Sequence, residues 1–275
     1  MVTLDGSSVL LQWATGGLGF LWLTNRHRLV GAGYGWLLRS SFGLLALGAF
    51  LIGVRFDFVP VRDIAALLVA LVSIGLLIYS FLRSRQQPAN AASGSSTDTA
   101  EGDIPGRALL NPQWDLVAPV IGVVGLVGAG LHVDEAGAAT LALAVVRMLV
   151  GAAFMGAVSD AMLLGHWYLV QPGLSRTPLR ELTIWTGVLW LPETVLFLIP
   201  EGMVSVWSGA IDDGYAGMLG WFWGACVVTT IALVIATLLA LKEKQYEAVM
   251  AATGLLYLAI LTGFGIDLVA RAILG

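Results

Sequence analysis

The chain has 275 residues, of which 58% are hydrophobic and only 12% are charged, and its formal net charge at pH 7 is −4. Soluble domains usually carry about 25% charged residues, so this composition excludes an ordinary soluble domain. It predicts an integral membrane protein embedded in a lipid bilayer. It also argues against nucleic acid as a partner.

Eight apolar segments follow one another along the chain, each close to the roughly 20 residues that a spanning helix needs. The first has no basic stretch before it and no clear cleavage site after it, so it is expected to be a retained helix. The sequence therefore predicts an all-α, polytopic bundle of about eight transmembrane helices, near residues 7–24, 35–54, 63–82, 114–132, 138–159, 181–199, 215–240 and 247–270.

The segment 83–112 interrupts this pattern, because it is rich in Ser, Ala, Gly, Gln and Pro and has hardly any large apolar residue. Such a segment cannot bury a hydrophobic core, so it is predicted to be a flexible cytoplasmic linker. It divides the chain into residues 1–82, with three helices, and residues 113–275, with five. A grouping of the helices four and four is equally possible from the sequence.

The basic residues predict the orientation of the bundle. With eight helices, the connections that carry most of the Lys and Arg all fall on one side, and cytoplasmic loops are enriched in these residues. Both termini then lie on the outer side, and we expect a multi-pass protein of the cell's inner (plasma) membrane. The residues concerned are Arg26, Arg28, Arg39, Arg83, Arg85, Arg176, Arg180, Lys242 and Lys244.

Two charged residues are expected at membrane depth, where a charge costs on the order of 3 kcal/mol and marks a candidate functional site. Arg147 lies about ten residues into the fifth helix, and Glu193 follows Pro192 in the outer half of the sixth. Because these helices are consecutive and antiparallel, the two side chains are predicted to share a depth and to pair. The pair suits a proton or substrate site beside a helix break, or equally a structural ion pair.

Polar residues also gather where the fifth helix ends, in the stretch "SDAMLLGHWYLVQPGLSRTPLREL" (159–182). The apolar run lasts about 50 Å as a helix, longer than a hydrocarbon core of roughly 30 Å, so this helix must tilt, bend or project. Asp160 is then expected near the inner boundary, with His166 beyond it at headgroup depth. A quinone headgroup or haem propionates would find an aromatic wall and arginines here, and interfacial anchoring is the alternative. The candidate cofactor-binding residues are His166, Trp167, Tyr168, Arg176 and Arg180.

A membrane-bound haem b needs axial ligands such as His from facing helices, and the chain has three histidines. His132 belongs to the outer side in the predicted topology, whereas His27 and His166 share the cytoplasmic side. They are the one pair of histidines expected at a similar depth. His27 lies in "NRHR", which also fits a solvated residue beside the membrane.

Motifs for self-contained catalysis are absent from the sequence. The single cysteine, Cys226, leaves no intramolecular disulfide, CxxC metal motif or CxxCH haem attachment motif. No Walker, HExxH or GxSxG motif occurs. Both lysines lie in one predicted loop, whereas a rhodopsin-like protein would need a lysine in its last helix.

Three hypotheses about function follow from these features. The leading one is a membrane subunit of a respiratory-type redox complex, which binds quinone or haem b near the cytoplasmic interface, transfers electrons and works with other subunits. It would be at most a quinone-reactive part of an oxidoreductase, with Asp160 as a proton acceptor. The second is a small transporter or channel with its site at Arg147 and Glu193. The third is a structural or assembly subunit without a ligand.

Overall fold

The computed structural model describes residues 4–91, 110–132, 137–200 and 202–274. Within these ranges the chain is helical and contains no strand, so the predicted all-α class is confirmed. The helices in chain order are α1 (Gly6–Asn25), α2 (Ala32–Phe56), α3 (Pro60–Ala91), the 3₁₀ helix η1 (Pro112–Leu116), α4 (Val117–Gly130), α5 (Ala138–Val170), α6 (Thr177–Leu196), α7 (Gly202–Trp207), α8 (Met218–Ala240) and α9 (Tyr246–Leu274).

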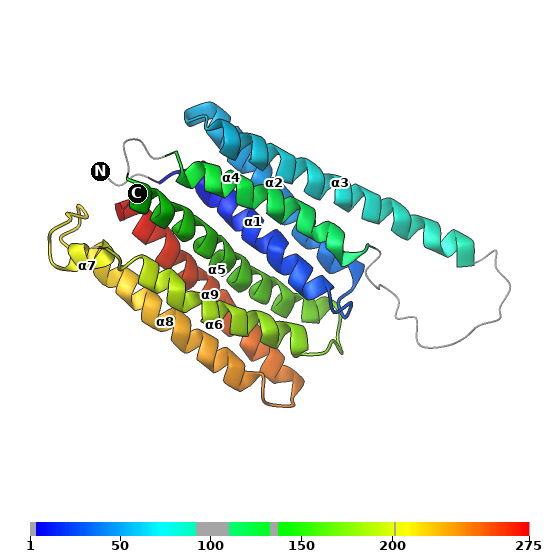
Figure 1. Cartoon of the computed structure of the whole chain (residues 1–275). Helices are drawn as coiled ribbons and strands as arrows, with labels where there is room; N and C mark the ends of the chain where they lie inside the picture. Colours follow the sequence, from blue (N-terminus) through cyan, green and yellow to red (C-terminus); the bar gives the residue numbers. More distant parts are fainter. Residues whose placement is uncertain (1–3, 92–109, 133–136, 201, 275) are drawn as a thin grey trace.

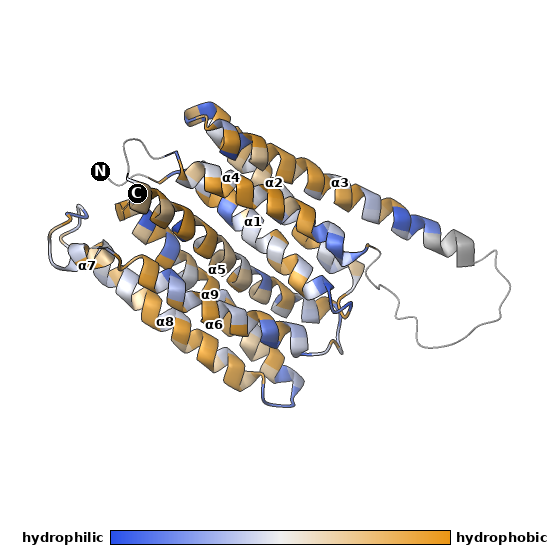
Figure 2. Ribbon diagram, viewed as in Figure 1, coloured by the Kyte–Doolittle hydropathy of each residue, from blue (hydrophilic) through white to orange (hydrophobic). Residues whose placement is uncertain are grey.

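Each of the eight predicted segments coincides with a helix, η1 and α4 together forming the fourth. Six of them are long and apolar enough to cross a membrane: α2, α3, η1 with α4, α5, α8 and α9. Figure 2 shows the apolar residues along the helices and hydrophilic residues mainly at their ends. The chain is therefore a helical membrane protein with six candidate spans. The expected count of eight, which needs α1 and α6 as well, stays a prediction.

The helices differ from the predicted segments in several places. Helix α3 continues to Ala91, nine residues into the segment expected to be a linker, and residues 92–109 of that segment lie outside the described residues. A short helix that was not predicted, α7, follows α6. Helix α5 is one continuous helix of 33 residues, as its long apolar run led us to expect.

The long helices pack as two groups of four. Helices α1, α2, α3 and α4 contact one another, as do α5, α6, α8 and α9, and the two groups meet mainly where α1 packs on α5. Figure 1 shows α1 and α5 side by side in the middle, α3 on one flank and α8 on the other. This packing corresponds to the four-and-four alternative. Helix α4, although it follows the expected linker, packs against α3 and α1.

Glycines bring the backbones of α1 and α5 into contact. A Cβ atom on Gly16 would lie 1.7 Å from the backbone oxygen of Ala152, and one on Gly156 would lie 2.2 Å from the carbonyl carbon of Gly16. No side chain fits in such a space, because real Cβ atoms do not approach other atoms so closely. The two helix groups thus meet through small residues, as is common between membrane helices.

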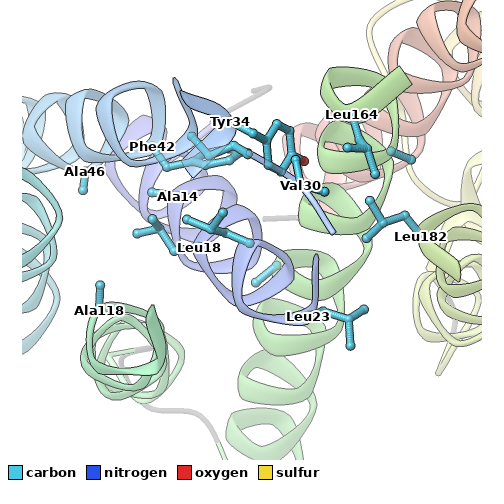
Figure 3. Close-up of a cluster of buried hydrophobic side chains, with 14 of the residues drawn as sticks. Ala14, Leu18, Leu23, Val30, Tyr34, Phe42, Ala46, Ala118, Leu164 and Leu182 are labelled. Atoms are coloured by element: carbon cyan, nitrogen blue, oxygen red, sulfur yellow. The ribbon is translucent and has the colours of Figure 1, made fainter. Parts of the chain in front are cut away.

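The interior combines apolar packing with hydroxyl groups, most of which form hydrogen bonds. Figure 3 shows the buried cluster around α1, to which α2, α4, α5 and α6 contribute Tyr34, Phe42, Ala46, Ala118, Leu164 and Leu182. Buried threonines donate to the carbonyl one helical turn earlier, which satisfies the hydroxyl without another partner. These threonines are Thr15, Thr183, Thr186, Thr237 and Thr253.

The start of α1 and the end of α9 lie at the same end of the bundle (Figure 1), and the basic connections lie at the opposite end. Arg26, after α1, pairs with Glu181 at the start of α6. Arg176, before α6, donates to the carbonyl oxygens of Glu243, Lys244 and Gln245 in the connection from α8 to α9. We refer to the end with the termini as the outer end and to the other as the inner end.

Candidate functional site

A group of buried polar side chains lies in the outer half of the bundle, where α1, α5, α6 and α9 meet. Asp267 of α9 is fully buried and accepts from Arg271 one turn later, with Nε 2.8 and 2.9 Å from its two carboxylate oxygens. The amide nitrogen of Gln12 on α1 donates to the same carboxylate over 3.1 Å. We call Gln12, Arg147, Glu193, Asp267 and Arg271 the outer cluster.

Gly151 of α5 makes room for the outer cluster. A Cβ atom at this position would lie 2.2 Å from the amide nitrogen of Gln12, 2.6 Å from Oδ1 of Asp267 and 2.8 Å from Nη2 of Arg271. The backbone of α5 contributes directly as well, because Nη2 of Arg271 donates to the carbonyl oxygen of Arg147 over 2.9 Å. Helix α5 therefore forms one wall of the cluster without a side chain.

Arg147 and Glu193 do not form the ion pair predicted from the sequence. Arg147 donates instead to the carbonyl oxygens of Leu196 (3.0 Å) and Ile199 (2.6 Å). Because α6 ends at Leu196, its last carbonyls have no partner within the helix, and a guanidinium at the same depth can satisfy them. The prediction that both residues lie at a similar depth agrees with the structure, since the two side chains are close enough to interact electrostatically.

Glu193 is left without a hydrogen bond. Its side chain is 0% exposed, and neither carboxylate oxygen has a hydrogen-bonding partner among the described residues. The carboxyl group of Asp267 lies within hydrogen-bonding reach of Glu193, so the two can form a hydrogen bond when one of them is protonated, and Arg271 and Arg147 lie near enough to interact with Glu193 electrostatically. The outer cluster therefore contains two carboxyl groups and two guanidinium groups, of which only Asp267 and Arg271 form a direct ion pair in the described part of the chain.

A cavity of about 640 Å³ lies next to the outer cluster, at the outer end of the bundle. Gln12 and Arg271 line its inner part, and the starts of α1 and α3 and the end of α2 line the rest. Arg62 also lines the cavity and is buried and bonded to Asp63 (2.8 Å) and Asp5 (2.7 Å). The cavity thus extends from the outer end of the molecule to the outer cluster.

The structure does not bring His27 and His166 together as haem ligands. His27 lies 2.9 Å from Glu181 at the start of α6. His166, exposed near the end of α5, lies 3.5 Å from the hydroxyl of Tyr257 on α9, with the two rings edge to face. Each histidine thus has its own partner, and their pairing as axial ligands stays a prediction. His27 lies in the turn after α1, and His166 lies on α5.

The remaining residues of the expected cofactor site serve several contacts. The indole nitrogen of Trp167 donates to Gln171 (3.2 Å), and the buried hydroxyl of Tyr168 donates to the carbonyl oxygen of Ser175 (2.5 Å). Arg176 binds the connection from α8 to α9, as described above, and Arg180 is exposed. Trp167 and Tyr168 therefore support the turn between α5 and α6, and they do not form a shared wall around His166.

Asp160 lies inside the bundle. It is 0% exposed, and neither of its carboxylate oxygens has a hydrogen-bonding partner in the described ranges. The Tyr34 hydroxyl of α2 is 3.3 Å from the backbone oxygen of Asp160. Asp160 is thus a second unpartnered carboxyl group. It precedes the end of α5 by ten residues, about 15 Å, so it lies closer to the inner end than the outer cluster does.

Gln12, Asp267 and Arg271 were not among the candidates chosen from the sequence. Asp267 lies within the eighth apolar segment, so the rule that marks charges at membrane depth applies to it as it does to Glu193. Arg271 follows Asp267 by four residues, the spacing of a helical ion pair. Gln12 carries no comparable signal, because an amide in an apolar helix is only modestly unusual.

No group of three or more His, Cys, Asp and Glu side chains with the geometry of a metal site occurs among the described residues. Comparison of the chain with models of protein families, with curated proteins and with solved structures found no match. The fold and the site therefore define only the class of protein, which is a helical membrane protein with a charged cluster beside a cavity.

Proposed function

We propose that this chain is a small membrane transporter that moves a polar solute together with protons, with its site at the outer cluster. The observation that carries the proposal is Glu193, a fully buried carboxyl group that accepts no hydrogen bond from a donor among the described residues. It lies beside the ion pair of Asp267 and Arg271, of which Arg271 lines a cavity. Buried polar networks with a purely structural role are normally satisfied. In the outer cluster, Glu193 lacks a hydrogen-bond donor.

Charge explains why Glu193 suits proton transport. A carboxylate that leaves water without a hydrogen-bond donor is strongly destabilised, and protonation removes its charge. Asp267 already compensates Arg271, and the donors of Arg147 are directed to the carbonyl oxygens at the end of α6. A solute that enters the cavity and competes for Arg271 would change the charge around Asp267 and Glu193, which couples solute binding to proton binding.

We assign the role of an inner proton acceptor to Asp160. It lies on α5, the helix that also contributes Gly151 to the outer cluster, and it is nine residues closer to the inner end, about 14 Å. Among the described residues it forms no ion pair, and its oxygens are unpartnered. The variant Asp160→Asn is expected to stop proton movement, as Glu193→Gln does.

Reconstitution tests the proposal. Purified protein is placed in liposomes that enclose a pH-sensitive dye, and amino acids, organic acids, sugars and amines are added outside in turn. At least one class is expected to change the internal pH, and Glu193→Gln is expected to abolish that change. Glu181→Gln removes the same group from the other end of α6 and serves as the control. Absence of a pH change with every class, or an unchanged signal in Glu193→Gln, would contradict the proposal.

The quinone-binding function expected from the sequence remains a second proposal, on a different observation. His166 and Tyr257 form an exposed pair of hydrogen-bonding rings near the inner end, where a quinone headgroup could reach them from the lipid. Haem b has less support, because His27 and His166 have separate partners. In this function the chain would be a subunit of a respiratory-type redox complex, with other subunits as partners.

Extraction of cofactors distinguishes the two functions. Under the redox proposal, protein purified in mild detergent should retain quinone, or show a Soret band that shifts with dithionite, and His166→Phe should lower the bound cofactor. Under the transport proposal, His166→Phe leaves solute-dependent proton movement unchanged. Mass spectrometry of co-purified proteins would identify partner subunits.

We further propose that the outer end faces away from the cytoplasm of a cell whose inner (plasma) membrane holds the protein. Single cysteines introduced at positions 90–100 should then be labelled only from the cytoplasm, and a reporter fused after Gly275 should behave as an external one. The native Cys226 is 5% exposed and adds little background. Labelling of positions 90–100 from outside would reverse the orientation.

A further inference from the structure

We propose that the outer-end cavity binds a small zwitterion with an apolar body, its carboxylate on Arg271 and its ammonium group on the side-chain oxygen of Gln12. An amino acid with an apolar side chain has this chemistry. The inference names the solute class of the proposed transporter and in that sense rests on it, although binding can be measured without transport.

Arg271 supplies the site for the carboxylate. Its Nε donates to Asp267 and its Nη2 to the carbonyl oxygen of Arg147, whereas Nη1 has no hydrogen bond to a described residue. The side chain lines the cavity. A guanidinium with a free N–H group forms strong, charge-assisted hydrogen bonds with carboxylates. The carboxylate of the solute would thus compete with Asp267 for the same cation.

Gln12 supplies the acceptor. Its side chain is 0% exposed, its amide nitrogen donates to Asp267, and its amide oxygen has no donor among the described residues. A buried acceptor without a donor is destabilising, and an ammonium group would supply the missing donor. Because Nε of Arg271 and the amide nitrogen of Gln12 both bond to Oδ1 of Asp267, at 2.8 and 3.1 Å, these two nitrogens lie within about 6 Å of each other and the guanidinium and amide groups are neighbours. The two charged groups of an α-amino acid, on one carbon atom, fit this spacing.

The rest of the cavity suits an apolar body and disfavours a simple anion. Leu4, Val9, Ile52, Phe56 and Met148 line it, and its volume of about 640 Å³ falls within the usual range for small-molecule sites. The carboxylates at the cavity are those of Asp5 and Asp57, and the other guanidinium, that of Arg62, is already bonded to Asp5 and Asp63. A negatively charged solute without an amine would be repelled by these carboxylates and would have only Arg271 as an available cation.

Matched ligands test the inference on purified protein in detergent. L-leucine, L-methionine and L-phenylalanine are titrated by calorimetry, with 4-methylpentanoate and 3-methylbutylamine as analogues of leucine that lack the ammonium or the carboxylate. At least one amino acid is expected to bind, and each leucine analogue at least tenfold more weakly than leucine. Equal binding of leucine and its analogues, or no binding of any of the three amino acids, would overturn the inference.

Two variants locate the site. Gln12→Leu removes the acceptor and should weaken amino-acid binding at least tenfold, and Met148→Trp fills the cavity from its apolar wall and should block it, whereas Glu181→Gln should leave binding unchanged. Full binding in Met148→Trp would place the site elsewhere. Zwitterion binding without proton movement would contradict the proposed function alone, and proton-coupled transport of another solute class without zwitterion binding would contradict this inference alone.

Discussion

The two ends of the bundle each bury an arginine with an aspartate, and the two arrangements differ in one respect. Near the inner end, Arg39 of α2 donates to Asp115 of η1 from Nε (3.0 Å) and Nη2 (2.5 Å), and Asn25 of α1 donates to the second carboxylate oxygen (2.9 Å). All three side chains are at most 5% exposed. We call them the inner cluster. Both oxygens of its only carboxylate have partners.

The outer cluster contains the same kinds of groups and leaves some of them unpartnered. Glu193 has no hydrogen-bonding partner among the described residues, and the side-chain oxygen of Gln12 has no donor there. The inner cluster connects three elements, α1, α2 and η1, and needs nothing more. The comparison teaches that burial of charges does not by itself mark a functional site. Groups that remain unsatisfied, next to a cavity, distinguish the outer cluster from a structural one.

The largest effect on stability is expected from the inner cluster. Arg39→Met leaves the carboxylate of Asp115 buried without its cation and should lower the free energy of unfolding by about 3–5 kcal/mol. The double variant Arg39→Met with Asp115→Leu should lose less, because no charge remains. Thermal unfolding in detergent measures both, with the exposed Arg180→Met as the control. If Arg39→Met lowers the free energy of unfolding no more than Arg180→Met does, the inner cluster does not stabilise the fold.

An intermediate effect is expected from Gly151. A methyl group there would collide with Gln12 and Asp267, so Gly151→Ala should lower the unfolding free energy by about 1–3 kcal/mol and weaken solute binding. Gly254→Ala on α9 is the matched control: no atom lies within 4 Å of its Cβ position, and alanine is about 1 kcal/mol better than glycine inside a helix. Equal stability of the two variants would mean that the outer cluster tolerates rearrangement.

A smaller effect on stability is expected from Glu193→Gln, although proton movement should stop. No donor among the described residues bonds to Glu193, and the amide of a glutamine can still donate to Asp267, so the unfolding free energy should change by less than about 1 kcal/mol. Asp115→Asn, the corresponding change in the inner cluster, should be clearly destabilising because its oxygens each accept bonds. Calorimetric unfolding of the two variants side by side is the measurement. A larger loss for Glu193→Gln would make the outer cluster the structural one.

The smallest effect is expected from Asp213, in the loop before α8. Burial alone would raise the pKa of this carboxyl group. The hydrogen bonds from the backbone N–H groups of Gly217, Tyr215 and Leu219 outweigh burial and hold the pKa below its ordinary value. Because the pKa is depressed in the folded state, the stabilisation is present above the unfolded pKa of about 3.9 and is lost as pH falls through the folded pKa. Asp213→Asn should therefore unfold at a slightly lower temperature at pH 7, and the difference from wild type should shrink on acidification. If the difference in unfolding temperature between Asp213→Asn and the wild type does not change with pH, the effect comes from the changed shape of the side chain and not from its charge.

Part of the site could be predicted from the sequence, because it depends on features that are local in the chain. Helix length and the alternation of direction follow from apolar run lengths and short connections, so Arg147 and Glu193 could be placed at a common depth on consecutive helices. Their direct pairing could not be predicted, because the free carbonyl oxygens at the end of α6 compete for the same guanidinium. The pairing of His27 with His166 stays a prediction for a related reason: depth does not define which side of a helix faces which neighbour.

The amino-acid sequence by itself determined the helical class, the positions of the long helices and the separation of the basic connections from the termini, since each depends on hydropathy and charge along the chain. Tertiary structure alone decided that α1 packs in the centre against α5, through Gly16 and Gly156. It also brought Gln12 within reach of Asp267, 255 positions away, and left Glu193 unpartnered beside them. Such contacts depend on which helix faces meet, and that is set by the fit of small and large side chains across the whole bundle.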